Sequence, residues 1–493
     1  MINLLIVTVV SLVIAYLIKS IRRPPNFPPG PIWLPIIGNL HQVKKLSIAQ
    51  GGQHLAFSKL SQDYNSNVIG LKLGGKYTIV IASYPLVKTV LTSEEYDGRP
   101  QNFFMILRSL GTGKGITGTD GELWRIQKHF VSVHLRQLGL GKTAMDTQIQ
   151  AEASEILVII EENVNKELQI GQILPKSVLN ILWMLMSGLR LSRNDDRLIK
   201  LLNLLHKRAK AFDMAGGTLN QMPWLRFVTP EWTGYNLIRN INEEFMTLLM
   251  EPIREHFKKW TDDRNDDLIY SFITEMRKAE GEKSTFTEDQ LLMVCLDIFL
   301  AGAQTTSNTL DFAFLMMLLY PEIKNKVHAC LDEAFQKSEE ITYSERKRVP
   351  YVEAVLYETE RFCTIAPIIG PRRVLRKTTL NGYDIPKDTT VLIHIHSVHN
   401  DVDYWQDPEI FRPDRFLDPK GNLMYHDRFL PFGLGKRRCL GEILAKNCIF
   451  TFFSQIMKSY QIELPPNAKK PTGVPQPGIT LSPEKYRAIF IKR

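Results

Sequence analysis

Residues 432–441 read Phe-Gly-Leu-Gly-Lys-Arg-Arg-Cys-Leu-Gly, and this stretch decides how the rest of the chain is interpreted. It fits the pattern F-x-x-G-x-R-x-C-x-G at every specified position, a match expected by chance in on the order of one such chain in ten thousand or fewer. A thiolate that binds a metal needs positive surroundings and close approach of the backbone. Arg437 supplies the charge and the glycines permit a tight loop. Cys439 is therefore predicted to be a metal ligand rather than a small buried hydrophobe.

On this motif the sequence resembles the cytochrome P450 superfamily of haem-thiolate monooxygenases, and the resemblance extends over essentially the whole chain. It implies a mostly α fold with a small β portion, in which a long central helix lies over a haem. It also implies that Cys439 is the axial ligand of the iron of haem b, with Phe432 and Arg437 at the cofactor. Thiolate ligation pushes electron density onto iron and favours O–O cleavage.

Among members of the superfamily, the chain is most similar to the insect microsomal type. This resemblance implies oxygen insertion into a lipophilic substrate, with epoxidation of methyl farnesoate to juvenile hormone as the expected reaction. A broad xenobiotic or fatty-acid hydroxylase is the alternative within the superfamily. A haem-thiolate isomerase or dehydratase and a haem sensor without turnover are alternatives of a different class. Electrons are expected from NADPH through a separate flavoprotein reductase, because the chain has no flavin or nucleotide motif.

Composition is that of a globular protein, with 44% hydrophobic and 23% charged residues among 493, which excludes disorder and a multi-span membrane protein. The 61 Lys and Arg exceed the 52 Asp and Glu, giving a formal charge of +9. No Lys/Arg run reaches five residues, so a nucleic-acid partner is not expected. The five cysteines are too few and too scattered for a disulfide framework, and no C-x-x-C pair offers a zinc site.

The amino-terminal segment is predicted to anchor the chain in a membrane. Residues 1–18 carry no charge, and Lys19, Arg22 and Arg23 follow at once. The apolar run is long enough to span a bilayer, and positive flanking charge keeps that side cytoplasmic. We therefore expect a transmembrane anchor over 1–18, a basic and proline-rich hinge over 19–38, and a catalytic domain over 39–493. The expected location is the endoplasmic reticulum membrane, with the catalytic domain facing the cytoplasm.

Strand-like runs are few. Two, at 68–73 and 77–82, are joined by Gly74-Gly75, and a second group lies at 378–380, 383–385 and 389–396. Most of the remaining chain has helical periodicity. Thr119-x-x-Glu122 is a capping-box pattern that predicts a helix through Trp124. Thr287-x-x-Gln290 predicts a longer helix that runs until Pro321, about 45 Å at 1.5 Å per residue.

Two further motifs are assigned by the family resemblance to a buried network behind the cysteine loop. Glu358-x-x-Arg361 has the i, i+3 spacing that places both side chains on one face of a helix. The second, Pro413-Asp414-Arg415-Phe416, supplies another arginine. A buried carboxylate shared by Glu358, Arg361 and Arg415 needs every donor satisfied, so loss of one member is expected to cause misfolding or haem loss.

The long helix carries Ala301-Gly302-Ala303-Gln304-Thr305-Thr306, which is similar to the oxygen-activation motif of the family. Thr305 is expected to donate hydrogen bonds and, through water, to help deliver protons. Gln304 stands where the family usually has an acid, so a direct carboxylate relay is in doubt and a water chain or a substrate group is the expected substitute. The alternative is a threonine that only bonds its own helix carbonyls.

Several side chains are expected at the haem or the substrate by position alone. Arg99, Trp124 and Arg372 are predicted propionate partners, together with Lys128, which replaces the arginine of the usual W-x-x-x-R and supplies a point charge. Exposed cations are expected to meet the reductase: Arg125, Lys128, Lys436 and Arg438. Substrate-facing candidates are 103–107, Phe212, Met214, Phe299, Ala301, Ala303, 365–369 and 479–481.

One motif is a decoy. Gly113-x-Gly115-x-x-Gly118 matches the dinucleotide fingerprint as a string, but it has no βαβ context and no suitably placed acid. It is interpreted as a flexible loop.

Overall fold

The computed structural model describes residues 2–137, 143–211, 219, 222–278, 284–336 and 339–493. Helices make up most of it. Their bounds are α1 Ile2–Ile21, α2 Leu40–Gln50, α3 Gln53–Asp63, α4 Tyr84–Thr92, α5 Phe103–Arg108, α6 Gly121–Gln137, α7 Thr143–Glu161, α8 Ile170–Ser187, α9 Asp196–Ala211, α11 Tyr235–Lys259, α12 Leu268–Lys278, α13 Glu288–Leu319, α14 Pro321–Ala334, α15 Pro350–Cys363, α16 Ile395–His399, α17 Val402–Trp405 and α18 Glu442–Ser459. The expectation of a mostly α fold is confirmed.

Three small sheets make up the β portion. The first has the order β1-β2-β7-β4, in which β2 runs parallel to β7 and the other pairs are antiparallel. The others are β3-β9-β8 and the hairpin β5-β6. The bounds are β1 Val68–Leu73, β2 Lys76–Ile81, β3 Glu167–Leu168, β4 Ile368–Arg373, β5 Thr378–Leu380, β6 Tyr383–Ile385, β7 Thr390–His394, β8 Tyr460–Glu463 and β9 Ala488–Lys492.

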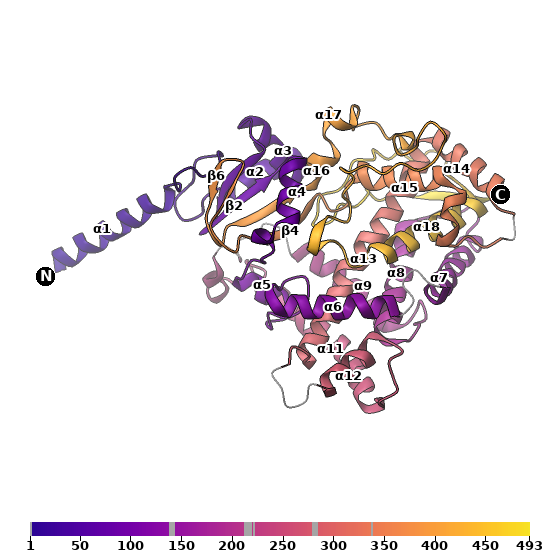
Figure 1. Cartoon of the computed structure of the whole chain (residues 1–493), viewed down its shortest axis with the longest axis horizontal. Helices are drawn as coiled ribbons and strands as arrows, with labels where there is room; N and C mark the ends of the chain where they lie inside the picture. The colour runs from indigo at the N-terminus through magenta and orange to yellow at the C-terminus, as the bar shows by residue number, and fades with distance from the viewer. Residues whose placement is uncertain (1, 138–142, 212–218, 220–221, 279–283, 337–338) are drawn as a thin grey trace.

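The central helix α13 organises the helical part of the molecule, where it contacts α8, α11, α15 and α18 (Figure 1). Thr287 caps it as predicted, because its side chain accepts a hydrogen bond from the Gln290 N–H at 3.3 Å. Tyr320 and Pro321 end it. Its apolar residues are buried on nearly all sides, which is the pattern of a core helix.

Two of the described helices are long and apolar enough to cross a bilayer, but they differ in burial. The α1 span Leu4–Ile21 is 6% buried, whereas α13 is 67% buried and belongs to the core. Helix α1 projects from the body at one end of the long axis (Figure 1). Its length, composition and exposure suit a membrane anchor.

The proline-rich segment that follows α1 packs against the first sheet. The Gly70 N–H donates to the Pro29 carbonyl at 2.7 Å, and Phe27 and Trp33 are buried with ring centroids 5.8 Å apart. The Arg23 guanidinium donates to the Pro31 carbonyl at 2.6 Å. These contacts orient the chain between the anchor and the body.

Two local predictions are wrong. Thr119 does not cap α6, which begins at Gly121, because its hydroxyl donates to the Gly115 carbonyl at 2.8 Å. The last strand of the first sheet ends at His394 rather than continuing to residue 396, because the chain turns into α16 at Ile395.

Candidate functional site

The loop 432–441 is folded tightly between the first sheet and α18. The Cys439 N–H donates to the Phe432 carbonyl at 2.9 Å, which closes the loop. Gly433 and Gly435 have φ values of +72° and +74°, a region that L side chains avoid. A Cβ on Gly435 would lie 2.2 Å from the Leu91 carbonyl oxygen at the end of α4. Gly433 and Gly435 are therefore required by backbone conformation and, at Gly435, also by close approach of α4.

Replacing Gly435 with alanine is expected to destabilise the protein by more than about 2 kcal/mol, because left-handed strain adds to the collision with Leu91. Gly382→Ala is the matched control. Gly382 has a φ of +78° but no atom within 4 Å of its built Cβ, so this variant costs only the strain, about 1 kcal/mol. Denaturant unfolding of both variants measures the difference. Equal losses would show that the contact with α4 is unimportant.

Cys439 differs from the other cysteines in its surroundings. Its side chain is exposed, whereas Cys295, Cys363 and Cys448 are buried. The protein nevertheless desolvates the Cys439 thiol and raises its pKa, against the opposing effect of a backbone hydrogen bond from Gly441. The sulfur is therefore accessible to a ligand although the surrounding protein desolvates it. This suits a cysteine that exchanges its proton for a metal.

Three guanidiniums gather beside the loop. Arg437 donates to the Asp97 and Thr119 carbonyls at 2.7 and 2.8 Å, and Arg372 forms an ion pair with Asp97 at 2.9 Å. Arg99 donates to the Pro371 carbonyl at 2.7 Å.

Burial lowers the pKa of each guanidinium of this group, and the positive charges of Arg437 and Arg372 lower that of Arg99 further. The pKa of Arg437 falls to about 10. Among the described residues, the buried Nε atoms of Arg99, Arg372 and Arg437 have no hydrogen-bond partner. Buried donors of this kind are costly unless an anion accepts from them. The cluster therefore has the positive charge and the unpaired donors that the carboxylates of a haem would need.

Trp124 and Lys128 contact the same loop, which begins at Phe432. The Arg437 guanidinium carbon lies 3.8 Å from the centroid of the Trp124 ring, a cation–π contact that fixes both side chains. The Lys128 ammonium donates to the Lys436 carbonyl, so its charge lies at the side of the loop. The Lys446 ammonium lies 5.3 Å from the centroid of the Phe432 ring.

The burial of α13 is interrupted at Leu300–Thr305. Ala301 is exposed and Gln304 and Thr305 are only partly buried, and the family resemblance places this face over the haem. The Thr305 hydroxyl donates to the Ala301 carbonyl at 2.7 Å. Two substrate candidates on this helix are corrected: Phe299 packs on Trp183 in the core, and Ala303 is 2% exposed. Both lie on the opposite side of the helix from Ala301.

The remaining substrate candidates lie on several elements. Phe104 and Leu107 of α5 form a buried cluster with Ile238, and Ile479 packs at its edge. The Leu481 N–H donates to the Ile365 carbonyl at 2.8 Å, and Asn308 of α13 donates to the Leu481 carbonyl at 2.9 Å. The other two candidates, Phe212 and Met214, lie outside the described residues.

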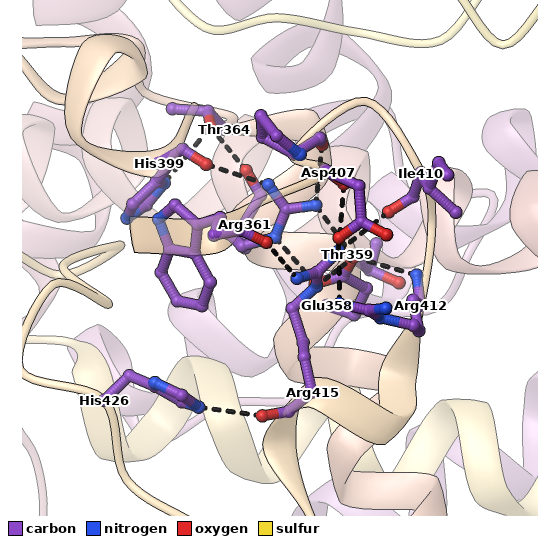
Figure 2. A network of polar contacts seen from close by, with 12 residues as sticks. Glu358, Thr359, Arg361, Thr364, His399, Asp407, Ile410, Arg412, Arg415 and His426 are labelled. Carbon is purple, nitrogen blue, oxygen red and sulfur yellow. Dashed lines mark hydrogen bonds and ion pairs between the residues drawn. The ribbon is translucent and has the colours of Figure 1, made fainter. Parts of the chain in front are cut away.

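Glu358, Arg361 and Arg415 form a buried network (Figure 2). Arg361 Nε and Nη2 donate to the two carboxylate oxygens of Glu358 at 2.7 and 2.8 Å, a bidentate pair that is fully buried. Arg415 Nε donates to the same carboxylate at 3.1 Å, and so does the backbone N–H of Arg412 at 2.9 Å. The other donors of Arg361 reach the carbonyls of His399 and Pro408.

His399 connects this network to the cysteine loop, a role that sequence reasoning missed. Its Nε2 accepts from the Leu430 N–H at 3.0 Å, and its Nδ1 lies 3.1 Å from the Thr364 hydroxyl. That hydroxyl donates to the Arg361 carbonyl at 2.6 Å. Burial lowers the pKa of His399 to about 3, so the ring is neutral and can accept from Leu430. Only the fold reveals the contact between His399 and Leu430, because it places the His399 ring against the segment just before the cysteine loop.

The glycine-rich loop after α5 is held in place rather than flexible. Asp297 of α13 accepts from the Ile116 and Thr117 N–H groups at 2.6 and 2.9 Å and from the Thr117 hydroxyl at 2.6 Å. Gln290 exchanges hydrogen bonds with both backbone groups of Gly115. A Cβ on Gly115 would lie 2.6 Å from the Asp297 carboxylate. Gly115 therefore serves close packing against α13, which gives this glycine of the rejected dinucleotide motif a structural explanation.

Comparison with known proteins agrees with this geometry. A family model described as Cytochrome P450 matches residues 28–490. The chain is 43% identical to the "Probable cytochrome P450 305a1" of Drosophila melanogaster, over 98% of each protein. It is 34% identical to the "Farnesoate epoxidase" of Bombyx mori, covering 97% of this chain and 96% of that protein. It is 33% identical to the "Cytochrome P450 2J5" of Mus musculus, covering 99% and 96%.

The match covers the cysteine loop, the cation cluster, the central helix and the buried network together. Members of the family are monooxygenases that hold haem b and take electrons from a NADPH-dependent reductase. The residues around Cys439 fit that cofactor, with a thiol for the iron and guanidiniums for the propionates. The chain belongs to the cytochrome P450 family and is a haem-dependent monooxygenase.

Proposed function

We propose that this monooxygenase epoxidises methyl farnesoate to juvenile hormone. The observation that carries the substrate is the similarity to the farnesoate epoxidase of Bombyx mori over nearly the whole of both chains. The apolar surroundings of α5, with Phe104 and Leu107, support a lipophilic substrate of this kind. The mouse relative, whose name states no substrate, is similar to nearly the same extent, 33% against 34%. The alternative reaction, hydroxylation of fatty acids, therefore belongs in the substrate test.

When bound, haem would supply the oxygen chemistry, in which O2, two electrons and two protons yield one oxygen atom on the substrate and one water. The residues of this chain would bind and orient that cofactor. Cys439 provides the anionic sulfur, and the loop that carries it is fixed by the Phe432 carbonyl and by α4. Arg99, Arg372 and Arg437 would orient the propionates through their unpaired Nε donors.

We propose that Thr305 holds a proton on the haem side of α13. Its hydroxyl now bonds the Ala301 carbonyl, and leaving that partner costs about 1 kcal/mol for one side-chain hydrogen bond. Gln304 cannot ionise, so it can orient water through its amide but cannot store a proton. Proton delivery along this face therefore depends on Thr305 and water.

The reductase is proposed to dock on the cations around the cysteine loop. Several of them have acidic neighbours: Lys436 pairs with Glu94, Arg438 lies 3.6 Å from Glu442, and Arg125 lies 3.6 Å from Glu122. Their side chains are largely exposed, so such pairs are weak and can exchange partners. Raised salt is expected to slow reduction, and salt-insensitive reduction would contradict this docking surface.

The location is proposed to be the endoplasmic reticulum membrane, with the catalytic domain on the cytoplasmic side. Exposed apolar helix α1 and the positive charges of Lys19, Arg22 and Arg23 support this orientation. Protease protection of the amino terminus in intact microsomes, with digestion of the body, tests it. Protection of the body would reverse the orientation.

The substrate assignment is tested with the full chain, its reductase and NADPH. Methyl farnesoate and a panel of fatty acids are incubated separately, and the products are identified by mass spectrometry. We expect one oxygen from O2 at the terminal double bond of the farnesoate. Hydroxylated fatty acids without a farnesoate epoxide would instead identify a fatty-acid hydroxylase. A product formed without O2 would identify an isomerase.

The same assay includes Thr305→Ala. Removing a positioned proton donor is expected to lower product formed per NADPH oxidised by about tenfold or more, since such groups contribute 10² to 10⁴ in rate. Ser307→Ala is the control, because Ser307 is buried on the core side of α13 and bonds the Ala303 carbonyl. Equal coupling in both variants would assign Thr305 a purely structural role.

A further inference from the structure

A hollow of about 280 Å³ lies beside the sheet β3-β9-β8, and none of the residues placed at the haem lines it. Its walls come from β3, from the residue before α8, from the loop 464–471 after β8 and from residues 484–487 before β9. Its volume is near the lower limit of ligand pockets, about 300 Å³, which suits a small and compact ligand. We call it the C-terminal hollow.

Positive charge exceeds negative charge in the lining. The cations are Lys469, Lys470, Lys485 and Arg487, whereas the lining has two carboxylates. One of these, Glu167, pairs with Arg487 at 2.9 Å, so both charges are used. The three lysines make no ion pair with any residue that the structure describes, and all three are exposed. The hollow therefore has three cations without a bonded anion.

The second carboxylate of the lining, Glu484, is occupied by its own neighbours. It accepts from the Thr472 hydroxyl at 2.6 Å and from the Thr472 N–H. These hydrogen bonds lower the pKa of Glu484, and the charge of Lys469 lowers it slightly further. Glu484 is therefore ionised at neutral pH and directed to Thr472, and its single charge does not balance the three lysines.

The floor of the hollow is fixed by the central helix. Tyr486 is 8% exposed, and its hydroxyl donates to the Asp311 carbonyl of α13 at 2.9 Å. Burial raises the pKa of the Asp311 carboxyl to about 7, so Asp311 adds only part of a negative charge at neutral pH. The buried Tyr486 and its exposed neighbour Lys485 thus form a rigid floor with a mobile cation at the rim.

The position of the hollow favours a ligand from solution. The C-terminus directly follows β9, and it lies at the opposite end of the long axis from the exposed apolar helix α1 (Figure 1). Attraction between exposed charges and a membrane surface extends only about 10 Å at ordinary salt. A lipid headgroup at the membrane that holds α1 is therefore not the expected occupant.

We propose that the C-terminal hollow binds a small soluble anion of the diphosphate class. A diphosphate carries several negative charges on closely spaced oxygens, so it can meet all three lysines, whereas one carboxylate or chloride neutralises only one. Lysine binds phosphates as a compact point charge on a flexible stem, which suits a small anion of this shape. This site is separate from the haem and the substrate, so the proposal does not depend on which substrate the enzyme oxidises.

The test is isothermal titration of the full-chain holoenzyme, in vesicles of neutral phosphatidylcholine, with inorganic pyrophosphate. The wild type is expected to bind it with an affinity that falls as salt is raised, because exposed charges are screened. Lys469→Gln/Lys470→Gln is expected to weaken binding by about tenfold or more, since it removes two of the three unpaired charges. Pyrophosphate should also raise the Tm of the wild type more than that of this variant.

Lys44→Gln/Lys45→Gln is the matched control. It removes two adjacent, exposed lysines from α2 and is expected to leave the affinity unchanged. Equal weakening in both double variants would show an effect of net charge alone and overturn the proposal. Wild-type affinity in Lys469→Gln/Lys470→Gln would also overturn it, because the pyrophosphate would then bind elsewhere, as on the cations around the cysteine loop.

A second set of vesicles separates a soluble ligand from a lipid headgroup. The titration is repeated with phosphatidylinositol 4-phosphate in the vesicles, and the pyrophosphate affinity of the wild type is expected to stay the same. Competition by these vesicles that disappears in Lys469→Gln/Lys470→Gln would assign the C-terminal hollow to a lipid surface and overturn the proposed soluble ligand.

Discussion

Replacing Cys439 with histidine is expected to abolish monooxygenase activity and the red-shifted Soret band of the reduced carbonyl complex. The loop can still present an axial ligand, but a neutral imidazole does not push electron density onto the iron as a thiolate does. The measurement is the carbonyl difference spectrum of the purified full-chain protein, together with product formation.

The matched control is Cys330→Ser, which changes a half-buried cysteine of α14. This variant is expected to keep both the band and the activity. If Cys439→His kept the red-shifted band, a different residue would be the axial ligand and the assignment of the loop would be wrong.

Glu358→Gln is expected to cause the largest loss of stability, about 3–5 kcal/mol, with loss of haem. The substitution removes the negative charge between two buried guanidiniums. It leaves Arg361 without an anion, while Arg415 keeps only its ion pair with Asp407 at 3.3 Å. The amide also places a donor where the carboxylate accepted from Arg361, Arg415 and the Arg412 N–H. Denaturant unfolding and haem content of the detergent-solubilised protein measure the effect.

Arg412→Gln provides the comparison for this network. The Arg412 guanidinium is 42% exposed, and Asp407, at 2.8 Å, is its only ion-pair partner among the residues that the structure describes. Its loss is therefore expected to cost at most about 1 kcal/mol. The backbone N–H that Arg412 gives to Glu358 is unaffected. Similar losses in Glu358→Gln and Arg412→Gln would mean that the buried carboxylate is not central to the fold.

Features encoded in short stretches were predictable from the sequence. Thr287 and Pro321 set the ends of α13, and Gly74-Gly75 joins β1 to β2 as expected. The spacing of Glu358 and Arg361 places both on one face of α15, where they form their ion pair. In each case the deciding interaction joins residues close in sequence, so periodicity and turn chemistry suffice.

Contacts between distant segments were not predictable in the same way. The Thr119 hydroxyl could either cap the first turn of α6 or donate to the Gly115 carbonyl. In the structure it donates to Gly115. The glycine-rich loop is fixed by Asp297, which lies about 180 positions later in the chain. His399 gains its role only from the elements that pack against it. A sequence read alone contains no signal for these partners.

The guanidinium cluster at the cysteine loop has a consequence for how the enzyme is produced. Arg99, Arg372 and Arg437 repel one another, and each carries a buried donor that an anion can satisfy. A ligand that binds only the folded state contributes its binding free energy to folding. Haem supply and folded yield are therefore one linked equilibrium, in which the amount of active enzyme follows the haem that a cell makes available.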